Sequence, residues 1–123
     1  MKIRVYYEDT DTGGIVYHSN YLNFCERARS EVFFSRGITP ELESGHFVAR
    51  KIIADYYRPA KLGDMLDIKT ELLDMKNASF VLKQTIFKEE SKLFELVITL
   101  AYIDFNGRAQ KLKDVKDFIL ELF

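Results

Sequence analysis

The stretch from residue 7 to residue 21 constrains the fold more than any other part of this chain. It reads YEDTDTGGIVYHSNY, with two acids ahead of the adjacent glycines Gly13 and Gly14. Adjacent glycines let the backbone turn sharply or approach a ligand closely. Ser19 and Asn20 are residue types that favour helix starts, and an amphipathic pattern begins directly after them. The stretch therefore predicts a strand, an acidic glycine loop and a helix start in one neighbourhood.

The polarity pattern predicts one long helix followed by a meander of long antiparallel strands. Residues 2–8 alternate and predict a half-buried strand with Ile3, Val5 and Tyr7 on one side. Helical spacing predicts a helix over 20–36 that ends at Gly37. Further strands are expected over 47–58, 65–76, 79–89 and 93–105, with a short strand at 108–113 and a last helix capped by Asp114. Residues 96–103 alternate little, which is typical of a central strand buried on both faces.

These elements predict an α+β fold in a single domain over residues 1–123. A single long helix covers only one face of a sheet. A second subunit is the simplest cover for the other face, so we expect a homodimer or homotetramer.

Composition excludes several kinds of partner. The net charge of −1 supplies no overall field that attracts nucleic acid or an anionic membrane, so an anionic ligand must be held by a local cluster. The first residues alternate charged and apolar, so no signal peptide is expected, and no apolar run approaches the ~20 residues of a membrane helix.

The only cysteine, Cys25, cannot form an internal disulfide, and a cytoplasmic protein is expected. Two separated histidines, His18 and His46, with one cysteine do not make a convincing zinc site, so no metal and no cofactor are predicted.

The motif YxDTDxxGxVYHxxY at residues 7–21 resembles the signature of hotdog-fold acyl-CoA thioesterases. It is most similar to the branch associated with the Tol-Pal system, which is related to 4-hydroxybenzoyl-CoA thioesterase. The resemblance continues at residues 26–29, 50–51 and 55–60 and so covers roughly the whole chain. It implies a sheet wrapped around a central helix, dimers with active sites at the subunit interface that often pair into tetramers, and a hydrolase of lipid metabolism.

The resemblance implies a catalytic role for Asp11 and His18. The second acid of the Asp-x-Asp pair is catalytic in the 4-hydroxybenzoyl-CoA relatives and falls on Asp11, while the backbone N–H that polarises the carbonyl falls on His18. Thioester hydrolysis needs little acid assistance, since a thiol with a pKa near about 8.5 leaves readily as thiolate. One carboxylate therefore suffices, as nucleophile or as general base. From spacing alone, a turn cap is the favoured role for Asp11, and the resemblance is what favours catalysis.

Other acids and the cysteine are assigned to structure. Asp9 is expected to cap the loop or to bond the backbone that positions the catalytic acid. Glu26 and Glu31 lie on the helix, where some hotdog enzymes carry their acid, but a solvated or interface face is the preferred interpretation. Cys25 is expected to be a small core residue rather than a nucleophile.

Binding residues follow from the same motifs. Residues expected to contact substrate are Tyr7, Gly14, Val16, Tyr17, Tyr56, Arg58 and Pro59, and those expected to meet coenzyme A are Arg50, Lys51, Lys61 and Lys76. Some relatives carry a run of basic residues for the nucleotide in the turn between the third and fourth strands, whereas this chain keeps only Lys76 there. Charges that flank a strand are usually just solvated.

The sequence thus predicts hydrolysis of acyl-CoA to the free acid and coenzyme A. A second hypothesis is a non-catalytic scaffold that binds acyl thioesters or acyl carrier protein. A third is a dehydratase that uses His18 and a helix glutamate on 3-hydroxyacyl thioesters. Acyl chain length and the choice between coenzyme A and carrier protein are left open.

Overall fold

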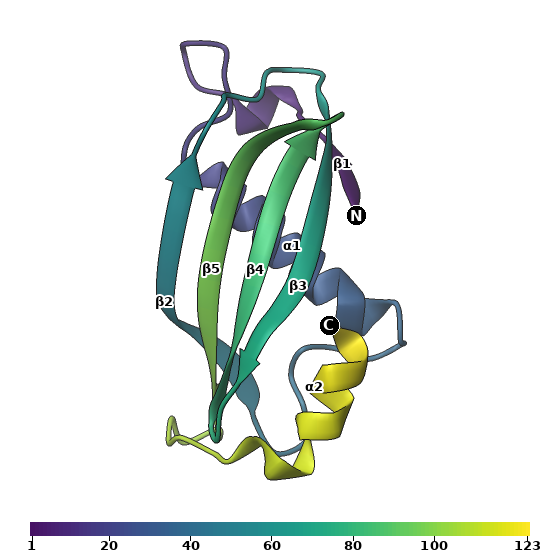
Figure 1. Ribbon diagram of the computed structural model, residues 1–123, viewed down its shortest axis with the longest axis vertical. Coiled ribbons are helices and arrows are strands. Elements are labelled where there is room, and N and C mark those ends of the chain that lie inside the picture. The colour runs from purple at the N-terminus through teal and green to yellow at the C-terminus, as the bar shows by residue number, and fades with distance from the viewer.

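The fold is a curved antiparallel sheet wrapped around one long helix (Figure 1). The computed structural model describes all 123 residues apart from the side chain of Asp114. The elements in chain order are β1 (Lys2–Arg4), the 3-10 helix η1 (Tyr7–Asp9), α1 (Asn20–Phe34), β2 (His46–Tyr56), β3 (Met65–Met75), β4 (Ser79–Lys88), β5 (Ser91–Ile103), the 3-10 helix η2 (Leu112–Asp114) and α2 (Lys116–Leu122). The strand order is β1-β3-β4-β5-β2, and every pairing is antiparallel. This arrangement confirms the predicted α+β hotdog fold.

The core lies between α1 and the concave face of the sheet. Alternate residues of β5 point to this face. Leu96 and Ile98 are buried there, and Ile98 lies opposite Leu82 of β4. From the helix, Phe24 and Ala28 are buried against them. The predicted apolar stripe of the helix therefore does face the sheet.

The end of α1 follows from one glycine. Gly37 has φ +75°, which is a left-handed conformation that costs a glycine little. The N–H of Ile38 donates to the carbonyl of Phe33, and the N–H of Gly37 donates to that of Phe34. These two bonds form the Schellman motif that closes a helix, and they confirm Gly37 as the stop.

The sequence predicts that a second subunit must cover the face of the sheet opposite α1, which is the convex face. The side chains on this face do not fit that prediction. A chain of ion pairs joins Lys69 to Glu71, Glu71 to Lys83, Lys83 to Glu95 and Glu95 to Lys92, at 2.8–4.0 Å. Register places Glu71, Lys83 and Glu95 on the same outer face of neighbouring strands. In β5 the outer residues are mostly half-buried, so this strand is not equally buried on both faces as predicted. This part of the face is compatible with water and by itself requires no second subunit.

The predicted first strand is wrong beyond residue 4. Only Lys2–Arg4 pairs with β3, and Tyr7–Asp9 forms a 3-10 turn. The Asp9 Oδ2 accepts a hydrogen bond from the N–H of Tyr6 at 2.8 Å, which folds the chain back before the strand continues. As a result Tyr7 does not face the core, and it is 82% exposed.

The predicted meander holds only for β3, β4 and β5. β2 pairs with β5 at the opposite edge of the sheet, so residues 57–64 cross the end of the sheet to reach β3 (Figure 1). Pro59 lies in this crossover, where its missing N–H interrupts no ladder. Sequence spacing alone did not reveal that the chain passes over two strands here.

The chain after β5 is less regular than predicted. No strand forms over 108–113; a single bridge joins Ile103 to Ala109, and a 3-10 helix follows. The N–H of Leu112 donates to the carbonyl of Asn77, which draws this segment against the β3–β4 turn instead of along β5. α2 begins at Lys116 with Val115 in the N-cap position, and the predicted capping side chain of Asp114 lies outside the described residues.

Replacing Gly45 by alanine should destabilise the fold by at least about 2 kcal/mol, which is in the range for forcing atoms into a packed site. Gly45 is buried, and a Cβ there would collide with the backbone oxygen of Ile103 beside the Tyr102 ring. Gly37→Ala is the matched control, with open space around the Cβ and only the cost of positive φ, about 1 kcal/mol. Urea unfolding measures both. A smaller loss for Gly45→Ala than for Gly37→Ala would contradict this packing.

Candidate active site

Asp11 lies in a tight hairpin loop between η1 and α1. A bridge between Thr10 and Val16 closes the loop, and the N–H of Asp11 donates to the carbonyl of Ile15 at 2.9 Å. The Asp11 Oδ1 accepts a hydrogen bond from the N–H of Gly13 at 2.8 Å. A Cβ on Gly13 would lie 3.1 Å from this oxygen, so glycine leaves the carboxylate room. The side chain thus caps its turn and is also exposed to solvent.

Asp9 differs from Asp11 in burial and in partners. Its side chain is buried and bonds Tyr6, while its carbonyl accepts hydrogen bonds from the Tyr17 N–H and the Asn20 side chain, both at 2.9 Å. These contacts tie η1 to the start of α1. Asp9 thus bonds the backbone of the loop, which is one of the two structural roles expected for it.

The start of α1 leaves backbone donors free. Ser19 occupies the N-cap position, as expected, but its side chain makes no capping hydrogen bond. Among the described residues, the N–H groups of His18 and Ser19 have no acceptor. A helix start carries partial positive charge, so it attracts an oxygen that is negatively charged or becoming so.

A cleft of about 400 Å³ brings the carboxylate and the helix start together. Its walls include Asp11 and Val16 from the loop, His18 from the helix start, and residues 56–59 from the end of β2 and the crossover. Both predicted catalytic residues and four of the predicted substrate-binding residues, Val16, Tyr56, Arg58 and Pro59, therefore line one surface.

Aromatic contacts hold the wall of the cleft. The Tyr56 hydroxyl donates to the carbonyl of His18 at 2.7 Å, and its ring packs edge-on against Tyr21. The Tyr21 ring stacks on Phe94, and its hydroxyl accepts a hydrogen bond from the N–H of Ala60 at 3.0 Å. Burial raises the pKa of both tyrosines, so each hydroxyl keeps its proton at neutral pH.

The other motif residues lie around this cleft. Tyr7 and Gly14 line a second hollow of about 460 Å³ that shares Asp11 with the first. Gly14 has φ +79°, which the turn requires. Tyr17 lines neither hollow, but its ring lies 4.4 Å from that of His18.

Sequence reasoning missed several members of these walls, among them Ile15, Tyr21 and Leu62. Ile15 lines the cleft and pairs with Lys61 of the crossover, which no local pattern indicates. Tyr21 is buried in the core, and it also lines the cleft. Leu62 lines the second hollow and is half exposed. An apolar residue in a polar turn was the available signal for Leu62.

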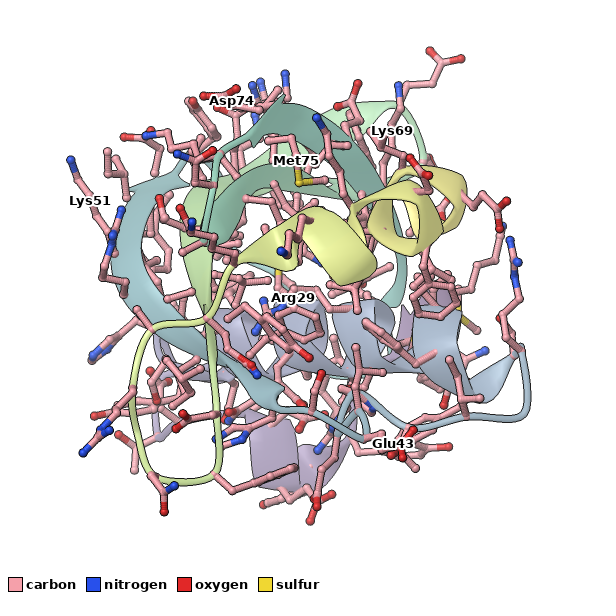
Figure 2. All side chains as sticks on the ribbon, turned by 90° about the horizontal axis from the view of Figure 1, so that it is seen from below. Arg29, Glu43, Lys51, Lys69, Asp74 and Met75 are labelled. Carbon is pink, nitrogen blue, oxygen red and sulfur yellow. The ribbon has the colours of Figure 1, made fainter. Side chains whose placement is uncertain are left out.

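The four basic residues predicted to meet coenzyme A do not form one cluster within a chain. Arg50 lies at a bulge in β2, and Lys51 beside it projects outward from the molecule (Figure 2). Lys61 is in the crossover, whereas Lys76 lies in the β3–β4 turn at the opposite end of the sheet (Figure 1). Three lysines from the C-terminal segment join Lys76 around a hollow of about 200 Å³: Lys111, Lys113 and Lys116.

The remaining candidates lie away from the cleft. Cys25 is fully buried, and burial raises the pKa of its thiol to about 12, so it is not a thiolate nucleophile at neutral pH. Glu26 and Glu31 are exposed and do not line the cleft, and Glu26 accepts a hydrogen bond from Ser30. His46 begins β2 and stacks on Phe105.

Within the described residues, no group of three or more His, Cys, Asp or Glu side chains is arranged to hold a metal ion. In the same part of the chain, neither α-helix combines the length and the apolar character needed to cross a membrane.

A curved sheet around a central helix, with a carboxylate beside the uncapped helix start, defines the chain as a hotdog-fold protein. Residues 13–95 match the Thioesterase superfamily, and the chain belongs to that family. Among curated relatives, the acyl-CoA thioester hydrolase YbgC of Escherichia coli is 40% identical over 123 residues, covering 94% of this chain and 92% of that protein.

Two further relatives agree. The acyl-CoA thioesterase YbgC of Helicobacter pylori is 53% identical over 87 residues. This alignment covers 71% of the chain and 65% of that protein, so the match spans slightly less than two thirds of that curated relative. The crystal structure of a probable thioesterase from Bartonella henselae superposes with a TM-score of 0.84 at 34% identity, covering 91% of this chain and 96% of that one.

The crossover that carries the cleft wall should be less stable in acid because of Asp64. Partial burial alone would raise the pKa of this carboxyl, but hydrogen bonds from Lys88 at 2.9 Å and from the Lys61 N–H at 2.8 Å lower it overall. A lowered folded-state pKa contributes stability above the unfolded value of about 3.9 and loses it as pH falls through the folded value.

Asp64→Asn should therefore lower the free energy of unfolding at pH 7, and the difference from the parent protein should shrink below about pH 4. Urea unfolding from pH 7 to pH 2 measures this. Asp74→Asn, at an exposed position of β3, is the control with little effect at any pH. A pH-independent effect of Asp64→Asn would contradict the assigned role.

Proposed function

We propose that this protein hydrolyses acyl-CoA thioesters to a free acid and coenzyme A. The observation that carries the proposal is the shared cleft of Asp11 and the uncapped helix start at His18. The names of the curated relatives, acyl-CoA thioesterase and acyl-CoA thioester hydrolase, support the same reaction.

The thioester carbonyl is placed with its oxygen toward the free N–H groups at the start of α1. As the carbonyl carbon becomes tetrahedral, negative charge gathers on that oxygen. Backbone donors that are already in place stabilise the charge without reorganising. The ~0.5 positive charge at a helix start adds to the effect. The His18 contribution is thus its backbone N–H, while its carbonyl is occupied by Tyr56.

Asp11 supplies the attacking oxygen by one of two routes. In the first, its carboxylate bonds to the carbonyl carbon, the C–S bond breaks, and water then hydrolyses the mixed anhydride. In the second, the carboxylate takes a proton from a water molecule that attacks the same carbon. In both routes the sulfur leaves as a thiolate, the acyl group becomes the free acid, and one water is consumed. The open position of Asp11 suits either route.

We assign the rest of the site to the substrate. Val16, Tyr56, Arg58 and Pro59 contact the thioester region from the cleft, and Tyr7, Gly14 and Tyr17 shape its outer side. Of the residues that line the cleft, Asp11 is the only acid, which disfavours a dehydratase that needs a helix glutamate.

Coenzyme A carries phosphates, which basic side chains recognise. We propose Arg50, Lys51, Lys61 and Lys76 for this role, with Lys76 supported by its three lysine neighbours from the C-terminal segment. Because these residues lie far apart in one chain, they require two subunits to surround one coenzyme A.

We further propose a homodimer, in which β2 of one chain lies against β2 of its partner. β2 is an edge strand of eleven residues, and Ile52 and Ile53 in its middle are 41% and 51% exposed. A long apolar edge favours pairing with another strand. Pairing into a tetramer, and a cytoplasmic location, stay predictions from the sequence.

Asp11→Asn should lower kcat at least ~100-fold, as removal of an acid–base group does, and leave the fold intact. The carboxamide oxygen of Asn can still accept the hydrogen bond from Gly13, so the loop keeps its turn. Thiol release from a panel of acyl-CoAs measures the rate, and Asp74→Asn is the matched surface control. Near-normal turnover by folded Asp11→Asn would remove this residue from the mechanism.

The same panel separates the enzyme from a scaffold that only binds acyl thioesters or acyl carrier protein. Thiol release by the parent protein that is lost in Asp11→Asn is expected of the enzyme. Binding of acyl thioesters with no thiol release from any of them would favour the scaffold.

The double substitution Ile52→Lys and Ile53→Lys should convert a dimer into a monomer, since like charges would oppose each other across the paired strands. Light scattering at micromolar concentration measures the mass, with Leu73→Lys at an exposed position of β3 as the control. A monomeric parent protein, or an unchanged dimer in the double variant, would contradict pairing through β2.

A further inference from the structure

A second cavity lies between the C-terminal half of α1 and the sheet, and it shares no lining residue with the cleft of Asp11. Its volume is about 150 Å³. Four aromatic rings form much of the wall: Phe33, Phe47, Phe80 and Phe123. A cavity of this size with apolar walls accommodates a body such as benzene.

The cavity also contains a cation, Arg29, which projects from α1 into the interior (Figure 2). Its Nη1 donates a hydrogen bond to the Gln84 Oε1 at 2.9 Å. Gln84 is fully buried, and its amide donates in turn to the carbonyl of Cys25 and to the Thr70 hydroxyl. This network holds the guanidinium in one orientation.

Arg29 has few polar partners within the chain as described, although the nearby charge of Glu26 opposes the lowering of the Arg29 pKa by burial. No Asp or Glu of the described residues forms an ion pair with it, and Gln84 is the only hydrogen-bond acceptor there for its five N–H groups. Glu26, on the same wall, bonds Ser30 at the surface instead. Burial lowers the pKa of Arg29, which reflects the cost of removing this charge from water.

We propose that this cavity binds a small carboxylic acid as its anion, with the carboxylate on Arg29 and the apolar body among the four phenylalanine rings. A guanidinium offers two parallel N–H groups that match the two oxygens of a carboxylate. The aromatic walls suit a singly charged anion with an apolar body and disfavour a phosphate, which brings more charge and no apolar surface. Free acids are also what thioester hydrolysis releases, and this link alone rests on the proposed function.

Isothermal titration of the purified protein with benzoate tests the proposal, and benzamide serves as the uncharged probe of the same shape. Benzoate should bind more tightly than benzamide. Arg29→Gln should weaken benzoate at least ~10-fold, as loss of a hydrogen bond to a charged group does, and should leave benzamide unchanged. Asp11→Asn should keep benzoate binding, which separates this cavity from the proposed active site.

A second variant tests the cavity independently, in case Arg29→Gln fails to fold. Ala49→Phe adds a ring at the cavity wall on β2 while leaving Arg29 and Gln84 in place, and it should also abolish benzoate binding. Circular dichroism checks the fold of each variant. Failure of benzoate to bind the parent protein, or undiminished binding to a folded Ala49→Phe or Arg29→Gln, would overturn the proposal. So would loss of binding in Asp11→Asn, whatever the outcome of the thiol-release assays.

Discussion

The site depends on the contact between the acidic loop and the crossover that joins β2 to β3. Ala60 is completely buried at this contact. Its N–H donates to the Tyr21 hydroxyl, and its carbonyl accepts a hydrogen bond from the N–H of Val16 at 2.9 Å. Ala60 of the crossover is therefore hydrogen-bonded both to α1, through Tyr21, and to the acidic loop, through Val16. The crossover sets the position of the loop that carries Asp11, and through Tyr21 the position of the helix start as well.

The start of α1 lacks the stabilisation that a side-chain hydrogen bond from an N-cap residue would provide. Ser19 has the right identity for a cap, and a capping serine typically contributes about 1 kcal/mol, yet its side chain makes no such bond. Tyr56, on the opposite wall of the cleft, fixes this first turn through the hydrogen bond from its hydroxyl to the His18 carbonyl. The donors are thereby left free for a ligand while the backbone that carries them is held in place.

Sequence reasoning succeeded where local chemistry decides the outcome. Gly37 ended the helix because its conformation is local, and the spacing of buried residues in α1 follows from the helical period. It failed where a long-range contact decides. Alternation over residues 2–8 predicted a full strand, but the bond from Tyr6 to Asp9 shortened it. The crossover of residues 57–64 and the lysines that gather at Lys76 depend on strand order, which no local pattern contains.

Two features of the chain support the proposed dimer. Asp11 is exposed, whereas in its proposed role its carboxylate would act more strongly on a carbonyl with water excluded. β2 ends at Tyr56 beside the cleft and leaves an apolar edge open along its middle. In the proposed dimer, a second copy paired antiparallel along β2 would cover that edge and would bring the start of the partner's β2 beside the Tyr56 end of this one. One contact would then both stabilise the sheet and close the cleft over the carboxylate.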